Sequence, residues 1–157
     1  MESKEVVQAF WQAYCATRPD PGVCLHGSYD AWSFGDSARL TDELGGLVLS
    51  GAKTATAGLM WEDEYFGWET PVVGGKTIIL DGENRPLCVI ETTDVVIEPF
   101  DDVDETFARR EGEGFESVDD WRRAHWRYFS RRCAEIGKEP SEQIPVLCQQ
   151  FRVVYPR

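Results

Sequence analysis

The stretch of the chain with the clearest chemical potential is Ser50-Gly51-Ala52-Lys53-Thr54-Ala55-Thr56. It places a lysine just after a glycine at which a helix can end, and two threonine hydroxyl groups follow within three residues. For its amine to act as a base near neutral pH, the pKa of Lys53 has to fall from about 10.4 toward 8, which costs roughly 3 kcal/mol of desolvation or like-charge repulsion. The competing interpretation is a surface lysine at a helix C-terminus, where its charge favours the helix dipole.

Strand geometry limits how these side chains can meet. If a strand covers residues 53–57, Lys53 lies on one of its faces and both Thr54 and Thr56 lie on the other, because side chains alternate along a strand. A site shared by Lys53 and Thr56 therefore requires a bulge or a turn where the strand begins.

A second group of candidate residues is Glu111-Gly112-Glu113-Gly114, which follows a predicted short helix over residues 100–110. A carboxylate flanked by glycines can approach a ligand closely, so Glu111 or Glu113 can serve as a general acid. The alternative is that both are ordinary solvated acidic residues where a helix stops.

A third group lies on a longer helix that we predict from Ser117 to about Gly137. Arg123, Arg127 and Arg131 repeat every four residues and share one face, close to aromatic residues. Arginines interleaved with aromatic side chains suit single-stranded nucleic acid, through phosphate contact and base stacking. In so acidic a chain, salt bridges on a solvent-facing surface are the competing interpretation.

The apolar face of the same helix carries Trp121, His125 and Phe129. A histidine between two aromatic residues at helical spacing is more often a hydrogen-bonded core residue than a catalyst, and we interpret His125 in this way.

Composition limits the partners of the protein. The 157 residues include 28 acidic and 16 basic side chains, a net charge of −12, which opposes binding to a phosphate backbone and disturbs a small neutral ligand far less. No apolar run approaches the roughly 20 residues of a membrane span, and the N-terminus lacks a signal peptide, so we expect a cytoplasmic protein with no membrane partner. The serine-hydrolase, P-loop, dinucleotide and zinc-protease motifs are missing from the sequence. The sequence does not predict the oligomeric state.

The cysteines carry no metal-binding pattern. All five (Cys15, Cys24, Cys88, Cys133 and Cys148) are expected to be free, buried and apolar in a reducing compartment. No CxxC pair is present and neither histidine has ligand spacing from a cysteine pair, so we expect no metal site and no cofactor.

The periodicity of the chain predicts an α+β fold in one domain. Long strands with few crossover units favour a small, mainly antiparallel β-barrel surrounded by helices. Helices are expected at 3–16, 38–50, 100–110 and 117–137, strands at 53–57, 77–80, 86–98 and 145–155, and loops at 18–22 and 61–69.

These motifs together resemble the ASCH domain family, in its longer bacterial branch. The resemblance is carried by Phe34-Gly35-Asp36-Ser37, the run from Leu47 to Thr56, Val73-Gly74, Leu80-Asp81-Gly82, Pro99-Phe100, Phe107-Ala108, Glu111-Gly112-Glu113-Gly114, Trp121-Arg122 and Phe151-Arg152-Val153-Val154-Tyr155. It covers most of the chain from about residue 30, and so implies one domain with a core over residues 31–157 and an N-terminal helical extension over residues 1–30. It also implies a PUA-like fold and an association with RNA.

The resemblance also implies an activity. Some family members are amidohydrolases that remove the acetyl group from the exocyclic amine of acetylated cytidine, with a lysine as base, a threonine as nucleophile and a glutamate as acid. By motif, these roles fall on Lys53, Thr56 and Glu111. Members of the longer branch are instead linked to RNA cleavage through the same lysine, and a binding module without chemistry is a third hypothesis.

The sequence departs from the family pattern at three positions. Gly75 replaces a usual aspartate, Phe115 stands where an acidic residue commonly follows the EGEG motif, and Gln149 stands where a glutamate follows the cysteine. If those carboxylates line the site in relatives, substrate preference differs here.

Our leading hypothesis is hydrolysis of acetylated cytidine at Lys53, Thr56 and Glu111, with single-stranded RNA cleavage or binding as alternatives. The substrate-binding residues are predicted to be Thr54, Glu113, Arg123, Arg127 and Arg131, and the partner is a small nucleoside or single-stranded RNA.

Overall fold

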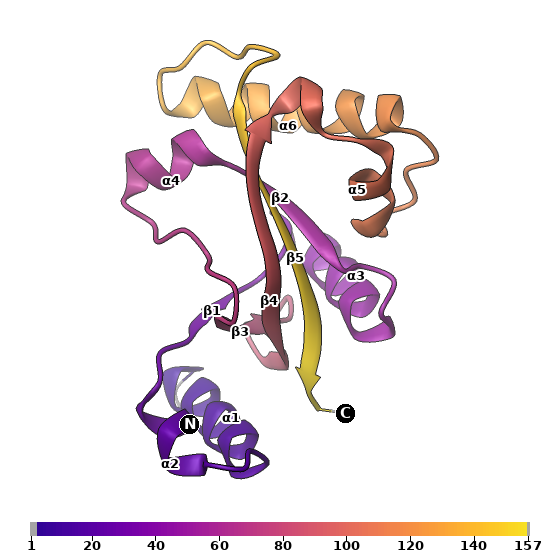
Figure 1. Cartoon of the computed structure of the whole chain (residues 1–157). Coiled ribbons are helices and arrows are strands. Elements are labelled where there is room, and N and C mark those ends of the chain that lie inside the picture. The colour runs from indigo at the N-terminus through magenta and orange to yellow at the C-terminus, as the bar shows by residue number, and fades with distance from the viewer. Residues whose placement is uncertain (1–2, 157) are drawn as a thin grey trace. The chain divides into compact units, whose positions relative to one another are not determined.

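The computed structural model describes residues 3–156 of the chain (Figure 1). Its helices are α1 (Ser3–Ala16), α2 (Pro21–His26), α3 (Ala38–Ser50), α4 (Met60–Phe66), α5 (Glu105–Arg110) and α6 (Val118–Glu135), with a short 3-10 helix, η1, at Phe100–Asp102. Its strands are β1 (Asp30–Trp32), β2 (Ala55–Leu59), β3 (Lys76–Leu80), β4 (Pro86–Pro99) and β5 (Pro145–Tyr155).

The strands are hydrogen-bonded in the order β1-β3-β4-β5-β2. β3 pairs antiparallel with β4, and β2 pairs antiparallel with β5, whereas the short β1 runs parallel to β3. The predicted α+β class with a mainly antiparallel sheet is confirmed.

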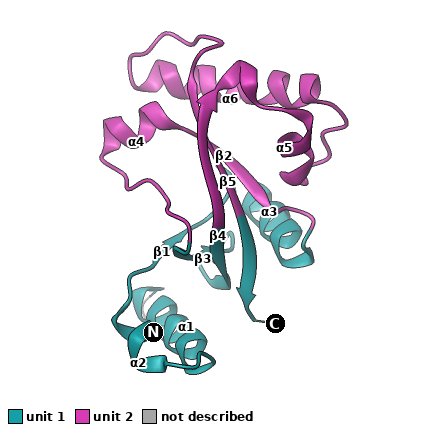
Figure 2. Ribbon diagram, in the orientation of Figure 1, with its two compact units in different colours: residues 1–51, 74–92, 151–157 teal, residues 52–73, 93–150 magenta. Residues whose placement is uncertain are grey.

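The chain divides into two units, each assembled from separate stretches of sequence (Figure 2). Unit 1 contains residues 1–51, 74–92 and 151–157, and unit 2 contains residues 52–73 and 93–150. Strands β4 and β5 contribute residues to both units. Whether the chain is a single domain with an N-terminal extension stays a prediction.

Unit 1 is built around the β3–β4 hairpin, which is buried on both faces. This explains its paired apolar residues, because a strand buried on both sides has no polar face. One face packs against α1 and the other against α3. The first cluster comprises Trp11, Tyr14, Cys15, Ile78, Val89 and Val154, and the second comprises Phe34, Leu44, Val48, Ile79, Cys88, Ile90 and Phe151.

Helix α3 ends where the sequence predicts. Ser37 caps its N-terminus by accepting a hydrogen bond from the Leu40 N–H at 3.2 Å. Gly51 ends the helix in the left-handed conformation, with φ of +83°, and its N–H donates to the Val48 carbonyl. The sharp stop at Gly51 turns the chain into the segment that carries Lys53.

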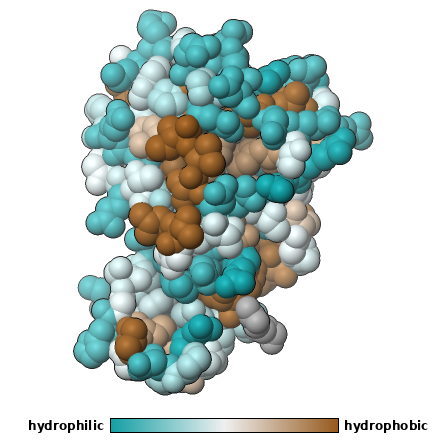
Figure 3. Space-filling view, viewed as in Figure 1, coloured by the Kyte–Doolittle hydropathy of each residue, from teal (hydrophilic) through white to brown (hydrophobic). Residues whose placement is uncertain are grey.

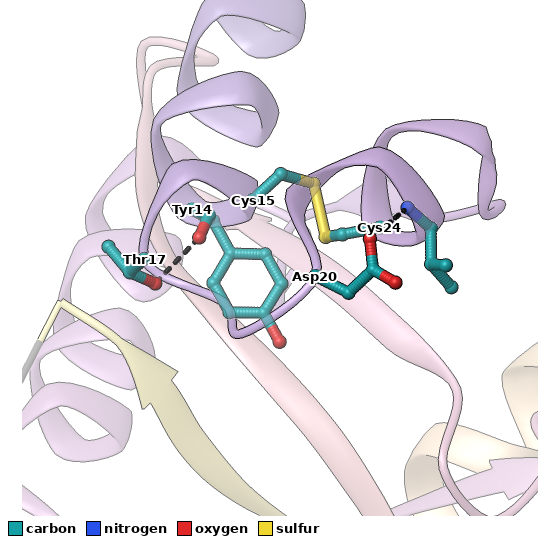
Figure 4. Close-up of a disulfide and its surroundings, with 6 residues drawn as sticks. Tyr14, Cys15, Thr17, Asp20 and Cys24 are labelled. Atoms are coloured by element: carbon teal, nitrogen blue, oxygen red, sulfur yellow. Dashed lines mark hydrogen bonds between the residues drawn. A yellow bond between two sulfur atoms is a disulfide. The ribbon is translucent and has the colours of Figure 1, made fainter.

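The expectation of five free cysteines is wrong for one pair. Cys15 of α1 and Cys24 of α2 form a disulfide, with their Cα atoms 5.3 Å apart (Figure 4). The predicted loop over residues 18–22 is correspondingly shorter, because Asp20 caps α2 by accepting a hydrogen bond from the Val23 N–H at 3.2 Å. Because α2 begins at Pro21, within the predicted loop, Cys24 lies on a helix that follows α1 closely. The spacing of the two cysteines in the sequence did not indicate that they would pair. The other three cysteines are free and buried as expected.

Unit 2 has its own core between α5, α6, β2 and β5. It comprises Ala55, Leu59, Phe100, Val103, Phe107, Ala108, Trp121, Phe129, Cys133, Ile136, Ile144, Val146 and Cys148. Ser117 caps α6 by accepting a hydrogen bond from the Asp120 N–H, which confirms its predicted start. Trp121, Phe129 and Cys133 form the predicted buried stripe of α6.

The acidic segment predicted as a loop over residues 61–69 contains a helix, α4, and that prediction was wrong. Two acidic residues in its first turn, Glu62 and Asp63, favour the helix dipole. Glu62 is also buried and paired with Arg132 of α6, whose Nε lies 2.7 Å from Glu62 Oε2. A tertiary ion pair therefore supports a helix that the local sequence did not indicate.

The visible face of the surface is mostly hydrophilic, as the net charge implies, with apolar residues gathered in separate patches (Figure 3). In unit 2, Tyr65, Phe66 and Trp68 are exposed, and the Phe66 and Trp68 rings stack with centroids 4.7 Å apart. Within residues 3–156, no helix is both long and apolar enough to cross a membrane.

Candidate functional site

Lys53 lies between the end of α3 and the start of β2, in a short turn of unit 2. Because β2 begins at Ala55, Lys53 lies before the strand, and strand alternation does not apply to it. Only 1% of the lysine side chain is exposed. The competing interpretation of a surface lysine is therefore wrong.

The ammonium group of Lys53 is surrounded by oxygen atoms. Nζ donates hydrogen bonds to the Ala55 carbonyl at 2.9 Å, to Glu113 Oε2 at 2.8 Å and, over 3.4 Å, to the Glu111 carbonyl. Glu111 Oε2 lies 3.8 Å from Nζ. A lysine ammonium has three donors, and each of these hydrogen bonds can use one of them. The bond to the Ala55 carbonyl also places Nζ beside the peptide group that joins Ala55 to Thr56.

The two carboxylates come from the loop that follows α5. Asp104 caps α5 by accepting a hydrogen bond from the Phe107 N–H, and the helix ends at Glu111. Gly112 then takes a φ of +67°, so the loop turns back along the lysine segment. A Cβ atom on Gly112 would lie only 2.0 Å from the Ala52 carbonyl oxygen and 2.8 Å from the Lys53 Cα. The glycine therefore permits the close approach that brings both carboxylates to Lys53.

Glu111 is held as a buried anion. Its side chain is 2% exposed, and Oε1 accepts a hydrogen bond from Trp121 Nε1 at 3.1 Å. Oε2 lies 3.4 Å from His125 Nε2. Burial alone would raise the pKa of Glu111, but the contact with His125 and the charge of Lys53 outweigh it and lower the pKa to about 2.

The pKa of Glu113 is shifted in the opposite direction. Burial and the neighbouring Glu111 raise the pKa of Glu113 above its ordinary value of 4.5, and the Lys53 ammonium only partly offsets this. Its side chain is 24% exposed, in contrast to 2% for Glu111, so Glu113 is the carboxyl group that a ligand can reach. Two carboxyls beside one lysine thus differ in both pKa and access, which is the arrangement that separates acid and base roles.

The two threonines have different surroundings. The Thr54 N–H and hydroxyl both donate to the Arg110 carbonyl, at 2.8 and 3.2 Å, which fastens the lysine segment to the end of α5. Thr56 lies in β2 directly opposite Gln149 of β5 and shares its face of the sheet. Thr54 thus has a structural partner, while Thr56 remains the candidate nucleophile.

The arginine row does not join this group. Arg123, Arg127 and Arg131 are exposed, and they lie about 200° around α6 from the face of His125. Arg123 pairs with Asp120, and the Arg131 guanidinium lies over the Tyr128 ring. The row is a solvent-facing surface of α6, and substrate binding by it stays a prediction.

Two residues of the site were missed by sequence reasoning, Trp121 and His125 as partners of Glu111. Their spacing correctly indicated one buried face of α6, and His125 is hydrogen-bonded, with Nδ1 3.0 Å from the Trp121 carbonyl oxygen. The available signal was the EGEG motif itself, because a carboxylate buried beside α6 needs hydrogen-bond donors.

Two of the three departures from the family pattern adjoin these residues. The Phe115 ring contacts the His125 ring edge-on at 5.6 Å, and Gln149 is buried opposite Thr56. Gly75 instead accepts a backbone hydrogen bond from Thr92 in unit 1. In the described part of the chain, no cluster of three or more His, Cys, Asp or Glu side chains could hold a metal ion.

Comparison with known proteins finds one matching family and several similar structures. The model of the ASCH domain family matches residues 30–155. A crystal structure of a protein from Enterococcus faecalis V583 is similar, with 35% identity and a TM-score of 0.85, over 96% of this chain and 88% of that one. A crystal structure of an ASCH domain from Lactobacillus crispatus JV V101 has 31% identity and a TM-score of 0.89, over 99% of this chain and 97% of that one. None of the curated proteins matches the sequence significantly.

These similarities confirm the α+β, PUA-like fold that the resemblance implied. The match over residues 30–155 includes every candidate site residue.

Proposed function

We propose, from the premise that this chain belongs to the ASCH domain family, that it is a hydrolase that removes the acetyl group from the exocyclic amine of acetylated cytidine. The observation that carries the proposal is the buried Lys53 ammonium beside two carboxyl groups, one with a lowered and one with a raised pKa. Amide hydrolysis needs a base for the nucleophile and an acid for the leaving amine, and one lysine–carboxyl pair can supply both.

The first step is a proton transfer within the Lys53–Glu113 pair. The 2.8 Å hydrogen bond carries a proton from Nζ to Glu113 Oε2, leaving a neutral amine and a carboxylic acid. The raised pKa of Glu113 makes this transfer less unfavourable. We therefore assign the acid role to Glu113, and Glu111, with its low pKa, remains an anion throughout.

The amide bond then breaks in two stages. The Lys53 amine takes the proton of the Thr56 hydroxyl as Thr56 Oγ1 bonds to the acetyl carbon, and the resulting ammonium stabilises the oxyanion. Glu113 protonates the exocyclic nitrogen as the carbon–nitrogen bond breaks, which releases cytidine and leaves an acetyl ester on Thr56. A water molecule, activated in the same way, hydrolyses the ester to acetate and restores Thr56.

Access to the lysine depends on Glu113. Since Nζ is closed to solvent, a substrate approaches it on the side of the partly exposed Glu113, after the proton has passed between the two groups. Gly114, next to Glu113, has a φ of +90° and open space where a Cβ would stand, so the loop has room on this side.

The charge of the protein favours a nucleoside over a long RNA. A net charge of −12 repels a phosphate backbone, and the exposed arginines of α6 face away from the side of the helix that holds Glu111. A neutral nucleoside avoids both difficulties.

The proposal is tested by incubating the protein with acetylated cytidine and, separately, with labelled single-stranded RNA. We expect cytidine and acetate to appear while the RNA stays intact. Thr56→Ala should lower kcat/KM by at least about 10³-fold. Thr56→Ser should retain much of the activity, and Thr93→Ala, at an exposed threonine of β4, should change nothing. RNA cleavage without cytidine release, or full activity of Thr56→Ala, would contradict the proposal.

The pH dependence of the reaction follows from Glu113. A raised pKa means that Glu113 keeps its proton to a higher pH than an ordinary glutamate, and once protonated it cannot accept the Lys53 proton. We therefore expect kcat/KM to fall as the pH drops through this raised pKa, with a midpoint above 4.5. Glu113→Gln should remove this acid limb together with most of the activity. A midpoint at or below 4.5 in the wild-type profile would show that Glu113 does not have this role.

A further inference from the structure

The His125 ring is in contact with three other aromatic rings. Its ring stacks on the Trp121 ring, with centroids 4.1 Å apart and planes 15° apart. Phe115 and Phe129 meet it edge-on, each with a centroid distance of 5.6 Å. These contacts hold the plane of the imidazole, and both of its nitrogens face oxygen atoms.

Both of those oxygen atoms are acceptors. Nδ1 lies 3.0 Å from the Trp121 carbonyl oxygen, which can only accept a hydrogen bond. Nε2 lies 3.4 Å from Glu111 Oε2, and an ionised carboxylate can also only accept. A neutral imidazole carries one N–H and would set a lone pair against one of these oxygens. With its N–H at Nε2, the ring donates to Glu111.

Glu111 therefore lies between the Lys53 ammonium and the His125 ring. Lys53 faces it at 3.8 Å and His125 at 3.4 Å, while Trp121 donates to its other oxygen. Glu113 is the remaining acidic neighbour, and the buried thiol of Cys148 lies close enough for Glu111 to contribute to its raised pKa. Of these two groups, Lys53 also contacts Glu113.

We propose that His125 is a positioning residue whose N–H at Nε2 holds Glu111 as an anion, so that the mobile proton of Lys53 passes to Glu113 rather than to Glu111. This inference rests on the proposed function for its catalytic consequence, but the placement of the proton does not depend on the substrate. Without that donor, Glu111 would depend on Lys53 and Trp121, and the proton of Lys53 would divide between the two carboxyls. Glu111 cannot replace Glu113 as the acid, because it is closed to solvent and already bonded to Trp121.

The inference is tested first without a substrate, by following the side-chain carboxyl carbons of Glu111 and Glu113 by ¹³C NMR as a function of pH. His125→Phe keeps a ring on Trp121 but removes both nitrogen contacts, and we expect the Glu111 titration midpoint to rise by at least about one pH unit. His125→Gln keeps an N–H donor for Glu111 and should restore part of the shift. An unchanged Glu111 midpoint in His125→Phe would overturn the inference.

Turnover of acetylated cytidine gives the second readout. We expect His125→Phe to lower kcat about 10- to 100-fold with little change in KM, and His125→Gln to recover part of the loss. A merely structural role would lower the amount of folded enzyme without this split and without rescue. If the wild type does not hydrolyse acetylated cytidine, the proposed function fails, while the carboxyl titration still decides the role of His125.

Discussion

Lys53→Met is expected to lower kcat/KM for acetylated cytidine by at least about 10³-fold, because the variant loses the base and the group that stabilises the oxyanion together. Methionine keeps the apolar stem of the buried side chain, so packing is disturbed little. The change is measured as cytidine released over time at equal concentrations of folded protein. Activity within tenfold of wild type would remove Lys53 from the chemistry.

Stability provides a matched check on the same variant. Removing Lys53 leaves Glu111 and Glu113 together without the cation between them, and breaking a buried ion pair costs about 3–5 kcal/mol. We expect the double variant Lys53→Met/Glu113→Gln to recover part of this free energy of unfolding but none of the activity. Lys76→Met is the control, since Lys76 lies in unit 1, is 24% exposed and pairs with Glu91. It should leave activity unchanged.

Gly112→Ala is expected to be the most destabilising single substitution in the candidate site. The added Cβ would lie 2.0 Å from the Ala52 carbonyl oxygen, and the backbone would have to move because both contacting groups are main-chain atoms. The left-handed conformation of Gly112, with a φ of +67°, adds about 1–2 kcal/mol for any residue with a side chain. Together with the clash, we expect a loss of more than about 4 kcal/mol in the free energy of unfolding, measured by urea denaturation.

Gly114→Ala separates the steric clash from the cost of the left-handed backbone conformation. Gly114 also has a positive φ, of +90°, but nothing lies within 4 Å of an added Cβ. It should therefore cost only the conformational term of about 1–2 kcal/mol. Equal losses at Gly112 and Gly114 would mean that the loop does not approach Ala52 as closely as the structure shows.

Much of the fold could be predicted because its signals are local. The bounds of α3 follow from a serine cap and a terminating glycine, and the start of α6 follows from Ser117 in the same way. The long strands β4 and β5 follow from their apolar runs. Each of these signals lies within a few residues of the feature that it determines.

The exceptions depend on distant contacts. Helix α4 is supported by the pair between Glu62 and Arg132, which lie 70 residues apart in sequence. The disulfide between Cys15 and Cys24 depends on how the turn after α1 directs the chain, and no spacing rule encodes it. Periodicity within one segment contains neither kind of information.

In the candidate site, too, some features follow from local sequence and others depend on distant contacts. The motifs singled out Lys53, Glu111 and Glu113 as candidates, and the structure brings these three together. Which carboxyl stays ionised could not be predicted, because it depends on Trp121 and His125, which reach Glu111 from another helix. The family motif implied Glu111 as the acid, whereas the surroundings of the two groups favour Glu113.

The chemistry proposed for this protein depends on that difference between two neighbouring carboxyls, and a ¹³C NMR titration of Glu111 and Glu113 in the wild-type protein measures it directly. We expect the Glu111 carboxyl to remain ionised down to a pH of about 2, and the Glu113 carboxyl to titrate with a midpoint above 4.5. If Glu111 titrates at the higher pH, or if both carboxyls titrate like ordinary solvated glutamates, the assignment of Glu113 as the proton carrier beside Lys53 is contradicted.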